Sequence, residues 1–201
     1  MNAMTGMATR LTHPAELVTG LPYLLGFHPT DSLVVITLQP GDPPTVGLVL
    51  RADLPPPEDE RELVEQLCTP VRTRGVVAAL VVVLGPRETA SAALVTRLRS
   101  AFGELGVAVP RALWAESTRH GARWSCLDDP RLGGALPDPA EHRLAAVSTV
   151  AGLVTFTDRS ALAALLAPDA EEALARRAAL LDAHVDEADR DRADGRRAAE
   201  R

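Results

Sequence analysis

Three side chains that could act in catalysis lie close together near the start of the chain. His28, Asp31 and Ser32 follow the apolar run that begins at Leu21, and they supply a base, a carboxylate and a hydroxyl within five positions. A catalytic Ser-His-Asp relay usually draws these groups from separate loops, and the sequence has no Gly-x-Ser-x-Gly elbow. The spacing favours a local turn, in which Asp31 or Ser32 caps backbone amides and His28 packs beside Pro29.

The two tryptophans form a second group. Trp114 and Trp124 lie symmetrically about a short polar segment, so a hairpin there would bring them opposite each other, with Glu116 on the same face. Stacked indole rings could hold a planar ligand, and Arg123 and Arg159 could clamp its carboxylate or phosphate. Paired tryptophans are also common in cores and domain interfaces. Both interpretations stay open.

A metal site is not predicted. The histidines are His13, His28, His120, His142 and His184. They are scattered along the chain, and no His-Glu-x-x-His motif is present. Asp128, Asp129 and Asp138 could hold a hard cation, but acidic loops that contain proline are commonly solvated turns. We therefore predict neither a metal nor a cofactor, and we assign no catalytic residue.

Charge and composition exclude several classes of protein. The net charge of −6 argues against general electrostatic binding of nucleic acid. All 21 basic residues are arginine, which excludes Schiff-base enzymes, P-loop NTPases and kinases, because these need a lysine. The longest apolar run, residues 76–84, is too short to span a membrane, and the first twenty residues hold no apolar core of a signal peptide. We expect a cytoplasmic protein with no membrane or nucleic-acid partner, and we lean against an enzyme.

Hydrophobic periodicity predicts an α/β fold. Strands at residues 32–39 and 45–54, joined by a turn rich in proline, should form an N-terminal β-hairpin. Residues 76–84 are apolar on both faces, as in a central strand, and an amphipathic helix at 88–105 connects them to a strand at 107–115. This unit is a βαβ crossover, so the sheet should be mixed.

Flanking helices complete the predicted domain. An N-terminal helix with Pro14 in its first turn should be broken by Gly20 and Pro22. Further helices are expected at residues 58–71, 141–153 and 159–167. These helices would cover the faces of the mixed sheet.

A helical extension is predicted for the C-terminal residues. Asp169 and Glu172 match a capping box, and apolar residues follow at alternating four- and three-residue steps. They are Leu174, Ala178, Leu181, Val185 and Ala188. Two heptads are fewer than a free coiled coil needs, so the helix should dock on its own domain or on a partner. The predicted organisation is a flexible N-terminus at 1–10, an α/β domain at 11–168, and a helix with a charged, frayed tail at 169–201.

Several short segments follow one another in a distinctive order. They are Pro-Ala-Glu-Leu at 14–17, Leu-Pro-Tyr-Leu-Leu-Gly-Phe-His-Pro at 21–29 and Ser-Leu-Val-Val at 32–35. Arg-Trp-Ser at 123–125, Asp-Pro at 129–130, Gly-Leu at 152–153 and Arg-Ser-Ala-Leu at 159–162 come later. This order resembles that of an uncharacterised actinobacterial family over residues 11–168. The family is known only as a domain of unknown function, so the resemblance implies no activity.

Two functions are compatible with these patterns. The first is a non-enzymatic module that forms a homo-oligomer or binds a protein partner through its C-terminal helix. The second is a small-molecule-binding protein or an enzyme of unrecognised type. Its site would lie at the carboxyl edge of the sheet, between the loop at residues 27–32 and the tryptophan hairpin. The candidate ligand-binding residues are His28, Asp31, Ser32, Trp114, Glu116, Arg123, Trp124 and Arg159.

Overall fold

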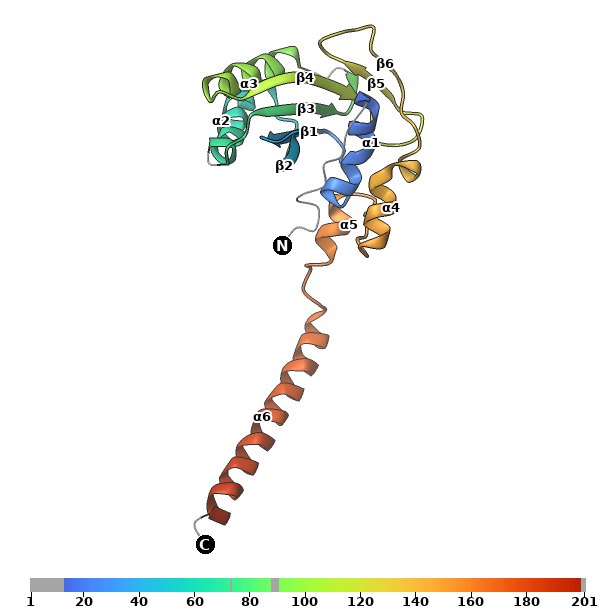
Figure 1. Cartoon of the computed structure of the whole chain (residues 1–201). Helices are drawn as coiled ribbons and strands as arrows, with labels where there is room; N and C mark the ends of the chain where they lie inside the picture. The colour runs from blue at the N-terminus through green and yellow to red at the C-terminus, as the bar shows by residue number, and fades with distance from the viewer. Residues whose placement is uncertain (1–12, 73, 88–90, 200–201) are drawn as a thin grey trace. The chain divides into compact units, whose positions relative to one another are not determined.

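The computed structural model describes residues 13–72, 74–87 and 91–199 (Figure 1). Its elements are α1 (Pro14–Leu25), β1 (Ser32–Gln39), β2 (Thr45–Asp53), η1 (Pro57–Asp59), α2 (Glu60–Arg72), β3 (Ala78–Leu84), α3 (Ala92–Glu104), β4 (Ala108–Ala115), β5 (Arg123–Cys126), β6 (Gly133–Ala135), η3 (Pro139–Glu141), α4 (Arg143–Val150), α5 (Arg159–Ala164) and α6 (Glu171–Ala199). Contacts divide the chain into two units, Met1–Leu162 and Ala163–Arg201. The predicted flexible N-terminus, residues 1–10, lies outside the described residues.

The first unit is built on a mixed sheet with the strand order β2-β1-β3-β4-β5-β6. β1 lies antiparallel both to β2, its hairpin partner, and to β3. β3 and β4 run parallel because α3 carries the chain back between them (Figure 1). The predicted α/β class is confirmed, with its N-terminal hairpin, its βαβ crossover and its C-terminal helix.

The central strands are apolar on both faces and are covered on both. On one side, which we call the α2/α3 face, Val35, Val81 and Val83 pack with the two helices around Phe102. On the other side, the α1 face, the alternate residues of the same strands pack against α1. Successive side chains of a strand point to opposite faces, so a continuous apolar run is buried only between two layers of helices.

The prediction that Gly20 and Pro22 break the first helix is wrong. α1 is continuous through both residues. At Gly20 a Cβ atom would lie 3.1 Å from Cε1 of His142, so the missing side chain lets the segment before α4 approach α1 closely. Packing of the buried side of α1 outweighs the low helix propensity of these two residues. The helix ends at Gly26, where φ is 81° and the N–H donates to the Pro22 carbonyl at 2.8 Å.

The second unit holds α6. The amides of Ala173 and Leu174 donate to the carbonyl of Ala170, so the helix begins just after that residue. The Asp169 carboxylate, which the sequence placed in a capping box, pairs with Arg177. The helix continues through the charged segment to its last residue at 199.

One buried carboxylate connects the two helices of the α2/α3 face. Glu60, the first residue of α2, is 5% exposed. Its Oε1 accepts a hydrogen bond from Ser91 Oγ at 2.7 Å, and its Oε2 lies 3.5 Å from Nε of Arg97. Ser91 Oγ in turn accepts from the Leu94 amide at 3.1 Å and so caps α3. Glu60 therefore ties the start of α2 to the start of α3.

We expect Glu60→Ala to lower the free energy of unfolding by about 1–3 kcal/mol, because it leaves Ser91 and Arg97 without their buried acceptor. Urea unfolding followed by circular dichroism measures the change. Glu62→Ala is the control, because Glu62 is exposed and bonds Gln66 on its own helix. Its loss should stay within about 0.5 kcal/mol. Equal losses for the two variants would contradict the role of Glu60.

Candidate functional site

The carboxyl ends of β3 and β4 mark the sheet edge where α/β proteins commonly bind ligands. Ser32, the first residue of β1, lies opposite Leu84 at the end of β3 and opposite Asp53 at the end of β2. After β4 the chain turns at this same edge to begin β5 at Arg123. The loop at residues 27–32 and the β4–β5 hairpin are thus neighbours along one edge.

His28 bonds a threonine of the hairpin. Its Nδ1 lies 2.8 Å from Oγ1 of Thr118, although 90 positions separate the two residues. Burial, and then the charge of Arg119, lower the pKa of His28 below 6.5, so the ring is neutral at pH 7. A neutral histidine beside a hydroxyl could act as a general base. Thr118 is 1% exposed, however, and its hydroxyl offers no access to a substrate. The pair therefore serves to join two loops.

Ser32 and Asp31 have other roles than a relay with His28. Ser32 Oγ donates to the Thr30 carbonyl at 2.5 Å and accepts from Nε of Arg51 at 2.8 Å. It thus bonds a carbonyl and a guanidinium instead of the expected backbone amides. Asp31 adopts φ of 44°, in the left-handed region that aspartate tolerates in turns. In the described contacts the three residues bond different groups, and no relay is formed.

The prediction that Trp114 and Trp124 face each other is wrong by one residue. Trp114 lies opposite Ser125, and Trp124 lies opposite the residue after Trp114. The Glu116 N–H donates to the Arg123 carbonyl at 2.9 Å, which centres the turn half a residue beyond the predicted position. A shift of one residue in pairing moves a side chain to the other face. Trp114 therefore packs in the α2/α3 core and Trp124 in the α1 core, without forming a stacking wall.

A cavity of about 500 Å³ lies beside Trp114 and the outer strands. It is lined by Arg87, Trp114, Arg123, Trp124, Gly134 and Ala135. The guanidinium carbon of Arg87 stands 4.9 Å from the centroid of the Trp114 ring, a cation–π contact. The indole N–H donates to the Gly85 carbonyl at 3.0 Å, which fixes the ring. Two guanidinium groups beside an aromatic ring suit a planar anion.

Sequence reasoning missed two residues at this edge. Arg87 follows the carboxyl end of β3, and a basic residue in the loop after a parallel strand is the signal that could have found it. Thr118 belongs to no motif, and only the folded structure brings it to His28. The cavity also unites three residues of the candidate set, Trp114, Arg123 and Trp124.

The other candidate residues lie elsewhere. Arg159 lines a separate cavity of about 460 Å³, together with Arg51 and Asp53. Glu116 is exposed at the end of the hairpin. The candidate set predicted from the sequence is therefore divided between different places, and only its part near Trp114 lines a cavity with two arginines.

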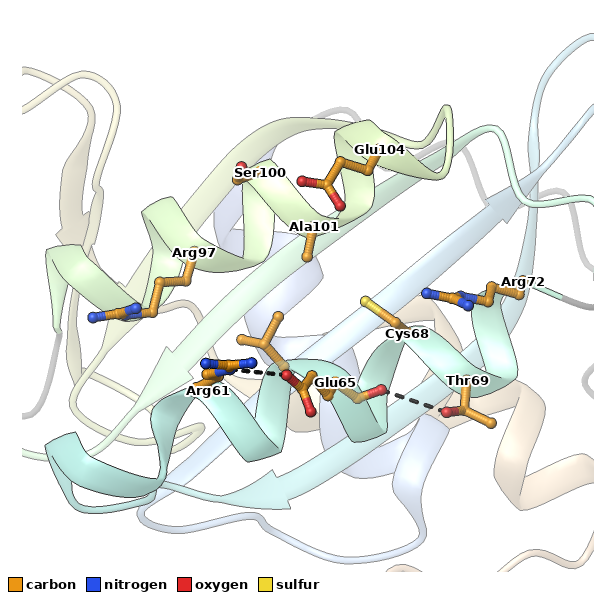
Figure 2. A pocket seen from close by; sticks show the side chains of 10 residues that line it. Arg61, Glu65, Cys68, Thr69, Arg72, Arg97, Ser100, Ala101 and Glu104 are labelled. Atoms are coloured by element: carbon orange, nitrogen blue, oxygen red, sulfur yellow. Dashed lines mark hydrogen bonds and ion pairs between the residues drawn. The ribbon is translucent and has the colours of Figure 1, made fainter.

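A groove of about 610 Å³ lies between α2 and α3. Figure 2 shows the side chains that line it. Arg61 and Glu65 of α2 pair at 3.0 Å, and Arg97 and Glu104 line the groove from α3. The thiol of Cys68 lies between the helices, and burial raises its pKa, so it stays protonated and unreactive at neutral pH. Because the lining carries charges of both signs, the groove favours no ligand of one charge, and we assign no chemistry to it.

The acidic loop after β5 bonds other parts of the chain. Asp128 accepts from the Ala112 amide at 2.9 Å and pairs with Arg99, while Asp129 pairs with Arg131 at 3.0 Å. Within the residues that the structure describes, no three histidine, cysteine or acidic side chains are grouped so that they could hold a metal ion. Over the same part of the chain, every helix is too short or too polar to cross a membrane.

The fold and its edge cavity define an α/β protein whose mixed sheet lies between layers of helices. A family model matches residues 14–201, and the chain belongs to this family, which is described as a domain of unknown function, DUF4192. The match confirms the resemblance of the opening segments and extends it past residue 168. No curated protein and no solved structure matches the chain. Function must therefore be argued from the residues.

His28 and His142 should give the first unit a pH-dependent stability. Burial lowers the pKa of both in the folded state, and His142 Nδ1 caps α4 by accepting from the Leu144 amide at 3.1 Å. The unfolded chain therefore binds their protons more tightly. The contribution of the two neutral rings to the free energy of unfolding is fully present above about pH 6.5. It is lost as the pH falls toward the lowered pKa values. We expect the urea concentration at the midpoint of unfolding to decrease when the pH is lowered from about 7.5 to about 5.5.

His28→Gln keeps a side chain that can bond Thr118 but removes the titration, so it should reduce this fall. A histidine NMR titration measures the cause directly. The midpoints of His28 and His142 should lie below 6.5. A midpoint at or above that value for either ring would contradict the assignment.

Proposed function

We propose that the protein is a non-enzymatic association module, and that α6 buries its apolar side against a helix of another protein chain. The exposed stripe on α6 is the observation that carries this proposal. Leu174, Leu181 and Val185 are 44%, 66% and 58% exposed. Together with Ala178 and Ala188 they recur at heptad spacing along one side of the helix.

The physical reason is the cost of leaving this stripe in water. Burying a leucine or valine side chain stabilises a protein by about 1.5–3 kcal/mol relative to leaving it exposed. α6 has 29 residues and is therefore about 43 Å long, enough to pack along another helix over several turns. The net charge of −6 favours a protein partner over a nucleic acid. We further propose that the association needs neither a metal nor a cofactor and takes place in the cytoplasm.

Site-specific photo-crosslinking tests this function. Leu181→benzoylphenylalanine places the reactive group inside the stripe, and Arg190→benzoylphenylalanine places it on the opposite side of the helix as a control. In cells that produce the protein, we expect adducts of higher mass from position 181 and few from position 190, detected by blotting and mass spectrometry. No adduct at 181, or equal adducts at both positions, would contradict the proposal.

A second candidate function is the binding of a small planar anion in the cavity beside Trp114. The contact of Arg87 with the indole ring, and the second guanidinium of Arg123, are the observations that favour it. The indole of Trp114 is only 5% exposed, so an aromatic carboxylate or a nucleotide could instead stack on the Arg87 guanidinium while its anionic group bonds the arginines. Such binding would be compatible with the association module, since the residues that line this cavity all belong to the first unit.

Tryptophan fluorescence tests the cavity, with 2-naphthoate and adenosine triphosphate as probes. We expect one of them to change the emission with saturation, and Arg87→Ala to weaken its binding by about tenfold through the lost charge-assisted bond. Arg159→Ala is the matched control, because Arg159 lines the other cavity. If neither probe changes the emission, the cavity binds neither aromatic carboxylates nor nucleotides, and the second candidate function is excluded for both.

A further inference from the structure

Over residues 174–189, basic and acidic residues lie on different flanks of the α6 stripe. At about 100° per residue, Arg177 and His184 lie along one flank of the stripe, and Asp182 and Asp189 lie along the other. All four side chains are exposed. In heptad terms they occupy g and e positions beside a seam of a and d positions, the places from which charges select a partner helix in coiled coils.

This sorting distinguishes two ways of pairing identical helices. In a parallel pair, a g residue of one helix faces the e residue five positions later in the other. Arg177 would then face Asp182 of the second copy, and His184 would face Asp189, each pair occurring twice by symmetry. In an antiparallel pair, g faces g and e faces e, so that aspartates would oppose aspartates. Like charges in such positions are destabilising.

We infer that the helix covering the stripe is α6 of a second copy of this chain, lying parallel and in register with the first. The inference rests on the proposed function and specifies its partner. The two helices bury Leu174, Leu181 and Val185 in the seam, and the attraction between Arg177 of one copy and Asp182 of the other favours the parallel orientation. The interface is symmetric, as is usual for homodimers.

The same spacing shows where the seam ends. The next a position is Arg192, which would meet its own copy in the parallel pair, so the apolar seam is confined to two heptads. Within its own chain, Arg177 pairs with Asp169, and His184 lies 3.8 Å from Glu187. Pairing exchanges some of these contacts for contacts with the second copy. Association should therefore be modest in strength and weaker in high salt.

Sedimentation equilibrium of the whole protein tests the inference. Protein concentrations up to about 200 µM suit the weak association that a short interface gives. We expect a monomer–dimer equilibrium that Leu181→Asp abolishes. Arg177→Asp and Asp182→Arg should each weaken the dimer by about tenfold, because each places like charges together twice. The double variant Arg177→Asp/Asp182→Arg should recover it. Arg176→Asp and Asp186→Arg, which make the same charge changes away from the seam, are the controls.

Each alternative outcome has a distinct meaning. Single charge variants that strengthen the dimer would overturn the parallel orientation, because in antiparallel helices they would bring unlike charges together. A wild-type protein that stays monomeric, while position 181 crosslinks to a different protein, would overturn the second copy as partner and leave the proposed function standing. A monomer without crosslinks at position 181 would overturn both.

Discussion

Burial of the central strands on both faces is the constraint on which the rest of the first unit depends. Val35 and Val81 must be covered on one side, and their neighbours Val34 and Val82 on the other, since all are fully buried. A single helical layer cannot do this, so α2 and α3 cover one face and α1 the other. The close packing of α4 against α1 explains why α1 contains Gly20, where a side chain would meet His142 at the cap of α4.

Local patterns predicted the elements well because their causes are local. The apolar runs of β1 and β3, the proline-rich turn and the amphipathic α3 all depend on residues near in sequence. The failures share a different cause. The register of Trp114 depends on how the turn before Arg123 closes, and the continuity of α1 through Gly20 and Pro22 depends on packing against a segment more than a hundred residues away. Neither contact leaves a periodic signal in the sequence.

In the candidate site, too, local features were predictable from the sequence and long-range contacts were not. The sequence predicted that the candidate residues form one site at the edge of the sheet, but Arg159 and Trp114 line different cavities. The partners of these residues were not predictable from the sequence. His28 is engaged by Thr118, and Ser32 by Arg51. The first contact joins two loops and the second joins β1 to β2, so side chains that could otherwise serve catalysis have a structural use here. Arg87, which lines the cavity beside Trp114, was missed although its place just after β3 was a usable signal.

In α6, the residues that stabilise the helix differ from the residues that form its exposed apolar stripe. Alanine has the highest helix propensity, and pairs such as Arg192 with Asp189 add local support, so the segment can form a helix without large apolar residues. Val185 is β-branched and slightly disfavours the helix, yet it stands in the stripe and is more than half exposed. Helix formation therefore does not explain the stripe. Under the proposed function, contact with another surface explains the stripe, and the aspartates and basic residues on its two flanks are compatible with a parallel copy of the same helix as that surface.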